Sequence, residues 1–172
     1  VVPLLTMRLL ADERKNGTFE LLITSPLSVG EIIVGKFLGV SIVLTLMGLL
    51  SFSFLLLLVV YADASFGGPE IAPMLTGLLG LLLIAFSFAS IGMVTSSFAE
   101  NQVVAGFTSV VVLLLFYMLG ASIDPAGGGA WDEVLRYISP VLQVQDFIRG
   151  VITLQSSVYF VSVITLGVFL SK

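Results

Sequence analysis

Long uncharged stretches alternate with short polar ones along this chain of 172 residues. Three stretches without a charged residue, Phe37–Ala62, Ile71–Ala99 and Asn101–Ile123, contain 26, 29 and 23 residues. A helix rises about 1.5 Å per residue, so each stretch can cross the roughly 30 Å hydrocarbon layer of a membrane. A fourth, shorter apolar run ends at Leu170. We therefore predict an all-α membrane helical bundle, one domain over residues 1–172, with four spans at 37–62, 72–99, 103–123 and about 155–171.

Two of the polar stretches are long enough to have structure of their own. Thr6–Lys36 carries eight charged residues. The other, Asp124–Ser157, contains two short segments with amphipathic spacing, Trp131–Ser139 and Val141–Ile152. A proline disfavours helix at the residue before it, so Ser139-Pro140 is a predicted break between them. We expect residues 124–154 to form an extracytoplasmic loop that contains two short helices.

Composition agrees with a membrane protein and removes several classes of chemistry. Hydrophobic residues make up 58% of the chain and charged residues 10%, where soluble domains have about a quarter charged. Without His or Cys, the chain cannot form a Ser-His or Cys-His pair, a disulfide or an ordinary zinc site. Seven Lys and Arg against eleven Asp and Glu argue against nucleic-acid binding. We expect no catalytic residue, metal or cofactor on this chain.

The basic residues fall unevenly on the two sides of the predicted membrane. If the chain crosses at each span, one side holds five Lys and Arg and the other holds two. Cytoplasmic loops carry the excess of Lys and Arg, so the first side is predicted to be cytoplasmic. The residues on that side are Arg8, Arg14, Lys15, Lys36 and Lys172.

The first five residues, Val1–Leu5, are apolar and lead directly towards Arg8. We interpret residues 1–5 as the end of a membrane helix whose start precedes this sequence. The alternative is a short hydrophobic N-terminal anchor. On the first interpretation, residues 6–36 form a cytoplasmic region between two spans.

The pattern of residues 6–36 predicts three helical pieces. Met7, Leu10 and Ala11 share a helical face, and Asn16-Gly17 is a typical helix end, so the first piece is predicted to continue to Gly17. Thr18 can cap a second, short amphipathic helix that ends at Ser25-Pro26.

A capping box marks the start of the third piece. Ser28 is followed three residues later by Glu31, and the helix then enters the membrane at Phe37. The short middle helix could lie on lipid headgroups or dock a cytoplasmic partner, and periodicity leaves both open.

A phosphate-binding motif is nearly present but does not fit its context. Residues 30–37 match G-x-x-x-x-G-K, but Phe37 stands where Ser or Thr would bind Mg²⁺, and a membrane span follows. We interpret Gly35 and Gly39 instead as a close helix–helix contact at the start of the span.

Taken together, these segments resemble the ABC-2 family of ABC transporter permeases, and most closely its gliding-motility-associated branch. The resemblance covers nearly the whole chain, with the right order and spacing between spans. The segments that carry it are 3–8, 12–26, 31–37, 100–105, 135–139 and 146–151.

The resemblance implies a permease subunit with a type V exporter-like fold in a bacterial inner membrane, of which this chain lacks the first span and most of the second. It implies an ABC ATPase on a separate chain, which holds ATP and Mg, and a second permease subunit, identical or different. It also implies that residues 17–26 form a coupling helix seated on the ATPase. The residues implied in docking and coupling are Glu13, Arg14, Gly17, Thr18, Phe19, Glu20, Leu21, Leu22 and Pro26.

Other classes of membrane protein fit the sequence less well. A secondary transporter or channel usually carries ionisable residues inside its spans, whereas these spans have none. An intramembrane protease would need His or an Asp pair within the spans. An ATPase-independent transporter and a non-catalytic membrane scaffold remain the alternatives to the permease.

Overall fold

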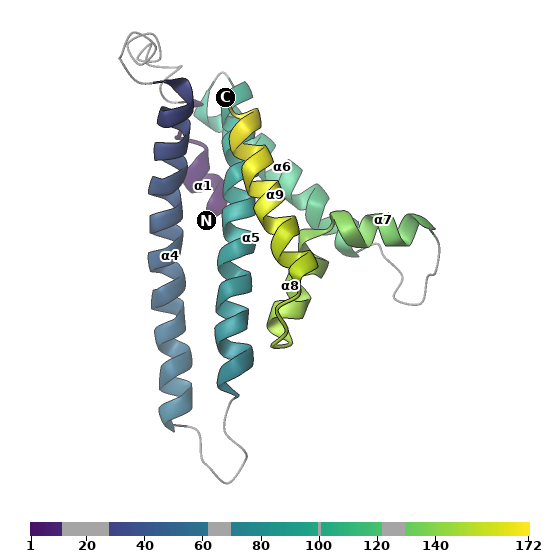
Figure 1. Cartoon of the computed structure of the whole chain (residues 1–172). Helices are drawn as coiled ribbons and strands as arrows, with labels where there is room; N and C mark the ends of the chain where they lie inside the picture. Colours follow the sequence, from purple (N-terminus) through teal and green to yellow (C-terminus); the bar gives the residue numbers. More distant parts are fainter. Residues whose placement is uncertain (12–27, 62–69, 100, 122–129) are drawn as a thin grey trace.

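A computed structural model describes residues 1–11, 28–61, 70–99, 101–121 and 130–172, apart from the side chains of residues 58, 121 and 130–133. The described residues form helices and contain no strand, which confirms the all-α prediction (Figure 1). The helices are α1 (Val2–Thr6), α4 (Val29–Tyr61), α5 (Ile71–Phe98), α6 (Gln102–Ala121), α7 (Ala130–Ile138), α8 (Pro140–Ile148) and α9 (Leu154–Leu170).

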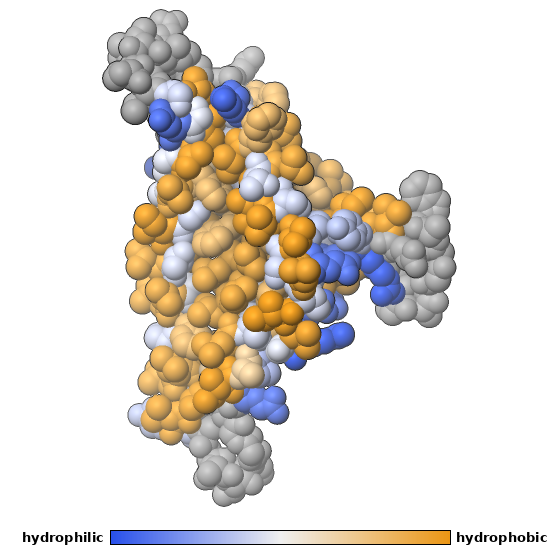
Figure 2. Space-filling view, in the orientation of Figure 1, coloured by the Kyte–Doolittle hydropathy of each residue, from blue (hydrophilic) through white to orange (hydrophobic). Residues whose placement is uncertain are grey.

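Helices α4, α5 and α6 are each long and apolar enough to cross a membrane, and α9 is a shorter apolar helix of 17 residues. Large apolar side chains cover the outer surface of the bundle, as the broad apolar band in Figure 2 shows. On α4, for example, Phe54 is 73% exposed and Val60 is 75% exposed. A surface of this kind is stable in lipid and not in water, so it is the lipid-facing surface of a membrane protein.

Helix α5 lies at the centre of the bundle and packs against α1, α4, α6, α8 and α9 (Figure 1). Small residues on α5 make these close approaches possible. A Cβ atom at Gly80 would lie 2.5 Å from the Cβ of Phe147 on α8, and a Cβ at Gly92 would overlap Thr6 at the end of α1. Ser90 and Gly167 make the same kind of contact between α5 and α9. Close packing of small residues is how helices associate in lipid, where apolar burial gives little driving force.

One end of the bundle gathers the three described basic residues among the five that the sequence assigns to a single side. Arg8 lies in the turn after α1, Lys36 near the start of α4, and Lys172 after the end of α9. The Lys172 side chain lies close to Gly30, since its Cε is 3.9 Å from a Cβ built there. We call this the basic end of the bundle.

The first helix is shorter than the sequence pattern predicts. Helix α1 ends at Thr6, and residues 7–10 form a turn in which the Leu9 amide donates to the Thr6 carbonyl at 3.1 Å. The predicted continuous helix through Met7 and Leu10 is therefore wrong. The apolar face was nevertheless identified correctly, because Leu10 and Ala11 are buried. The helix is interrupted because the amides of Leu10 and Ala11 bond to the Ser96 hydroxyl of α5.

Candidate coupling site and membrane path

The residues predicted to dock an ATPase lie in the segment 12–27, outside the described residues. They are Glu13, Arg14, Gly17, Thr18, Phe19, Glu20, Leu21, Leu22 and Pro26. The structure does describe both flanks of this segment, residues 1–11 before it and residues 28–36 after it. The attachment of these flanks determines which helices would move together with the segment.

The flank before the segment is bound to α5 by one side chain, Ser96. Its hydroxyl accepts hydrogen bonds from the backbone amides of Leu10 at 3.3 Å and Ala11 at 3.2 Å. The same hydroxyl donates to the carbonyl of Met7 at 3.4 Å. Ser96 is completely buried, and its bonds from the two amides are buried as well. Water therefore does not compete for these two bonds. We call this arrangement the Ser96 clamp.

Apolar packing reinforces the clamp on both sides. Ala11 forms a buried cluster with Ala99 at the end of α5 and Ala105 on α6. Met7 packs against this cluster, and its sulfur lies 3.0 Å from a Cβ built at Gly106. The small side chains let the turn approach both helices closely. Residues 7–11 are therefore held by α5 and α6 together.

The flank after the segment begins with the predicted capping box, which the structure confirms. The Ser28 amide and hydroxyl donate to a carboxylate oxygen of Glu31 at 2.7 and 2.8 Å, and the Glu31 amide donates to the Ser28 hydroxyl at 3.3 Å. These bonds start α4 outside the predicted span. They hold the pKa of Glu31 below its ordinary value, first through the backbone amide and then through the hydroxyl of Ser28.

The two flanks are also joined to each other. The ammonium group of Lys36 donates a hydrogen bond to the carbonyl of Leu9 in the turn. Beside it, Leu10 from the turn, Ile33 from α4 and Met93 from α5 form a buried apolar cluster. The entry and exit of segment 12–27 are therefore fixed to α5 and to one another at the basic end.

The predicted contact at Gly35 and Gly39 finds no partner within the described part of this chain. Both glycines are exposed on α4, and a Cβ built at either meets nothing within 4 Å. The helix–helix contact expected at these glycines stays a prediction. Within the bundle, close glycine contacts are made on α5 at Gly80 and Gly92 and on α6 at Gly120, positions that the sequence did not single out.

At the other end of the bundle, α8 folds back against α5. Phe147 of α8 is completely buried and packs on Gly80 of α5 and Phe160 of α9. Gly150, with a positive φ of 85°, turns the chain beside Pro73 near the start of α5. The two predicted short helices thus exist as α7 and α8, separated at Ser139 as expected.

Hydrogen bonds join α8 and the end of α7 to the start of α9. The Ser156 hydroxyl donates to the amide oxygen of Gln143 at 2.8 Å, and the Thr153 hydroxyl lies 3.3 Å from a carboxylate oxygen of Asp146. The Tyr159 hydroxyl donates to the carbonyl of Ile138 at 2.5 Å. Polar groups buried in an apolar surrounding need such partners. The network gives α8 and α9 a fixed relative position.

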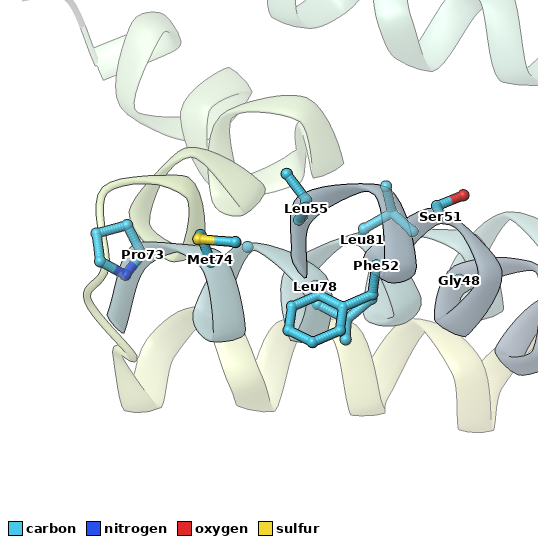
Figure 3. Close-up of a pocket in the computed structure, with 9 residues that line it drawn as sticks. Gly48, Ser51, Phe52, Leu55, Pro73, Met74, Leu78 and Leu81 are labelled. Carbon is cyan, nitrogen blue, oxygen red and sulfur yellow. The ribbon is translucent and has the colours of Figure 1, made fainter. Parts of the chain in front are cut away.

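Two of the cavities that border the spans have apolar linings. One, of about 300 Å³, lies between the second half of α4 and the first half of α5. Figure 3 shows the side chains that line it, and Ser51 carries the single hydroxyl among those labelled. A second, of about 220 Å³, lies between α5, α6 and α9 beside Pro140. No charged residue lines either one. Such cavities suit hydrocarbon chains and offer no group for acid–base or nucleophilic chemistry.

Most hydroxyl groups within the spans are used for packing and for bonds to their own helix. Ser87 and Ser90 on α5 are completely buried and donate to the carbonyls of Leu83 and Ser87. Ser51 is exposed and bonds to its own helix in the same way. This outcome favours helix packing over a polar path as the role of these residues. Among the described residues, no group of three acidic side chains gathers as a metal site would require.

The fold and its apolar surface are those of a membrane component, and comparison with known proteins gives its family. No curated protein matches this sequence significantly. The family model described as "ABC-2 family transporter protein" matches residues 3–170, which is nearly the whole chain. The chain therefore belongs to the ABC-2 family of transporter proteins.

Proposed function

We propose that this chain is a permease subunit that docks a separate ABC ATPase through residues 13–26 and forms half of a transmembrane path with a second permease subunit. Membrane proteins of the ABC-2 family generally work with an ABC ATPase. The proposal assigns ATP and Mg to that partner and assigns no cofactor to this chain. It takes the basic end as cytoplasmic, in a bacterial inner membrane.

The attachment of both flanks of segment 12–27 is the observation that carries the proposal. The Ser96 clamp binds the first flank to α5, and the bond from Lys36 to the Leu9 carbonyl joins the second flank to the first. In the proposal, a displacement of the segment is passed to α5 through these contacts of its two flanks. Because α5 also packs against α8 and α9, movement at the basic end reaches the other end of the bundle.

In the proposed mechanism, ATP closes the ATPase dimer and displaces the coupling segment. Leu21 and Leu22 supply apolar contacts to the ATPase, and Glu13, Arg14 and Glu20 supply charged contacts around them. Gly17 and Pro26 are predicted to bound the coupling helix that Thr18 caps and that contains Phe19. The displacement then passes through the Ser96 clamp to α5, and α5 shifts relative to its counterpart in the second subunit.

The test is stimulation of ATP hydrolysis in the reconstituted complex. Glu20→Lys combined with Leu22→Asp should abolish stimulation while the protein still inserts into the membrane. The matched control is Glu70→Lys combined with Ile71→Asp, two exposed residues at the opposite end of α5, which should leave stimulation intact. Unchanged stimulation in the first variant contradicts docking through this segment and favours an ATPase-independent transporter or a scaffold.

The resemblance to the gliding-motility-associated branch supports a finer proposal, that the transporter serves surface motility. A deletion strain of a gliding host should then lose surface spreading and regain it with the intact gene. Normal spreading of the deletion strain would remove this finer assignment and leave the permease proposal untouched.

A further inference from the structure

A groove lies between α4 and α9 at the basic end of the bundle, where α4 begins and α9 ends (Figure 1). Its volume is about 380 Å³, within the range of sites that hold small molecules. The residues that line it lie between Gly30 and Phe37 on α4 and between Ile164 and Lys172 at the end of α9. At about 1.5 Å per residue, the groove extends about 10–12 Å along the two helices.

Away from Lys172, the walls of the groove are apolar apart from one hydroxyl. That hydroxyl belongs to Thr165, and it donates to two carbonyls of its own helix at 2.9 and 3.0 Å. Val34 on one wall is 45% exposed, and Phe169 on the other is 72% exposed. The groove is therefore open to the surrounding bilayer and presents it with a surface that suits a hydrocarbon chain.

A single charged side chain, that of Lys172, is among the described residues that line the groove. Lys172 is exposed, and its Nζ lies 4.0 Å from a Cβ built at Gly30, so the ammonium group lies beside the first turn of α4. Two other charged groups near the start of α4 are bonded elsewhere. The ammonium of Lys36 donates to the turn after α1, and the carboxylate of Glu31 caps its own helix. The groove thus has a cation at the end nearest the membrane surface and apolar walls beyond it.

We propose that this groove binds one anionic phospholipid from the leaflet on the basic side. The phosphate lies against Lys172, and the first part of an acyl chain lies between α4 and α9. A cation followed by about 10 Å of apolar wall matches the order of headgroup and acyl chain in a lipid, and basic pockets between membrane helices bind anionic headgroups. The bound lipid would join the start of α4 to the end of α9. The proposal does not depend on ATPase docking, so either can fail alone.

Quenching of a single tryptophan by brominated lipids measures which lipid lies in the groove. The sequence contains one Trp, so Trp131→Phe gives a background into which one reporter can be introduced. Phe169→Trp places the reporter in the groove. Phe54→Trp on α4 is the matched control, because the two phenylalanines are 72% and 73% exposed and Phe54 does not line the groove. The full chain is reconstituted in phosphatidylcholine vesicles that contain a small fraction of brominated phosphatidylglycerol or brominated phosphatidylcholine.

In Phe169→Trp, phosphatidylglycerol should bind about fivefold more tightly than phosphatidylcholine, which is the effect of one cation beside an anionic headgroup. Adding Lys172→Gln should reduce this ratio to about one, and Lys172→Arg should preserve it. Arg8→Gln should also preserve it, because Arg8 is an exposed charge at the same end that does not line the groove. The Phe54→Trp reporter should show a ratio of about one.

Three results would overturn the proposal. The first is equal quenching by the two brominated lipids in Phe169→Trp. The second is an equal loss of the preference in Lys172→Gln and Arg8→Gln, because it would assign the preference to the general charge of the basic end. The third is weak quenching of Phe169→Trp by both lipids together with strong quenching of Phe54→Trp, because it would show that protein covers the groove instead of lipid.

Discussion

Replacing Ser96 with alanine is the sharpest perturbation of the link between segment 12–27 and the bundle. The change removes one hydroxyl that bonds the amides of Leu10 and Ala11 and the carbonyl of Met7. Because one hydroxyl serves all three bonds, and each is long at 3.2–3.4 Å, its loss should cost about 1–2 kcal/mol in total. That free energy corresponds to an increase of about 5- to 30-fold in the open fraction of the turn.

Hydrogen exchange of the backbone amides measures this opening directly. In Ser96→Ala, the amides of Leu10 and Ala11 should exchange about 5 to 30 times faster than in the parent chain. The matched control is Ser97→Ala, because the Ser97 hydroxyl bonds only to Val94 of its own helix at 2.7 Å. Under the proposed function, Ser96→Ala should also weaken ATPase stimulation, and Ser97→Ala should not.

Two outcomes would refute this reasoning at different points. Equal exchange rates in the two alanine variants would show that the Ser96 hydroxyl does not hold the turn. Faster exchange with unchanged ATPase stimulation would keep the clamp as a structural contact and remove it from the coupling path.

Three further predictions concern single contacts. Gly80→Leu should destabilise the bundle by about 1–3 kcal/mol in thermal unfolding, because its Cβ would meet Phe147, whereas Gly77→Leu, with open space around it, should not. Lys36→Met should raise the proteolytic sensitivity of residues 7–11, since the bond to the turn is lost, and an unchanged cleavage rate would contradict that tie. Glu31 has a lowered pKa when folded, so its contribution to stability is present at neutral pH and is lost as the pH falls through that value. The difference in melting temperature between the parent chain and Glu31→Gln should therefore shrink at acid pH, and a constant difference would argue against the capping box.

The position of α5 explains why the contacts at both ends of the bundle depend on one helix. Its buried face is made mostly of small residues. Gly80 contacts α8, Gly92 contacts the end of α1, and Ser96 bonds the turn at residues 7–11. Helices in lipid associate through such close packing, so each contact is sensitive to one added methyl group. This sensitivity is what makes the glycine variants informative.

The sequence alone determined the helical spans, the short helices α7 and α8 and the capping box, because each depends on local features. A run of more than 20 apolar residues can only be a span, and Ser139-Pro140 can only interrupt a helix locally. The Ser28–Glu31 bonds join residues three positions apart. The family followed from the same segments in their order, and the family model agrees.

Only the tertiary structure decided which faces meet. Apolar residues surround these helices on all sides, so the pattern gives no face and cannot distinguish Gly80, which is packed, from Gly35, which is open. The role of Ser96 was equally hidden, because its partners in the turn are more than eighty residues away in sequence. The position of α7 in the bundle also depends on contacts between distant segments, Ile138 with Tyr159 and Pro140 with α5. Apart from the turn after α1, sequence thus determines local structure here, whereas packing between chemically similar surfaces depends on shape, which exists only once the chain is folded.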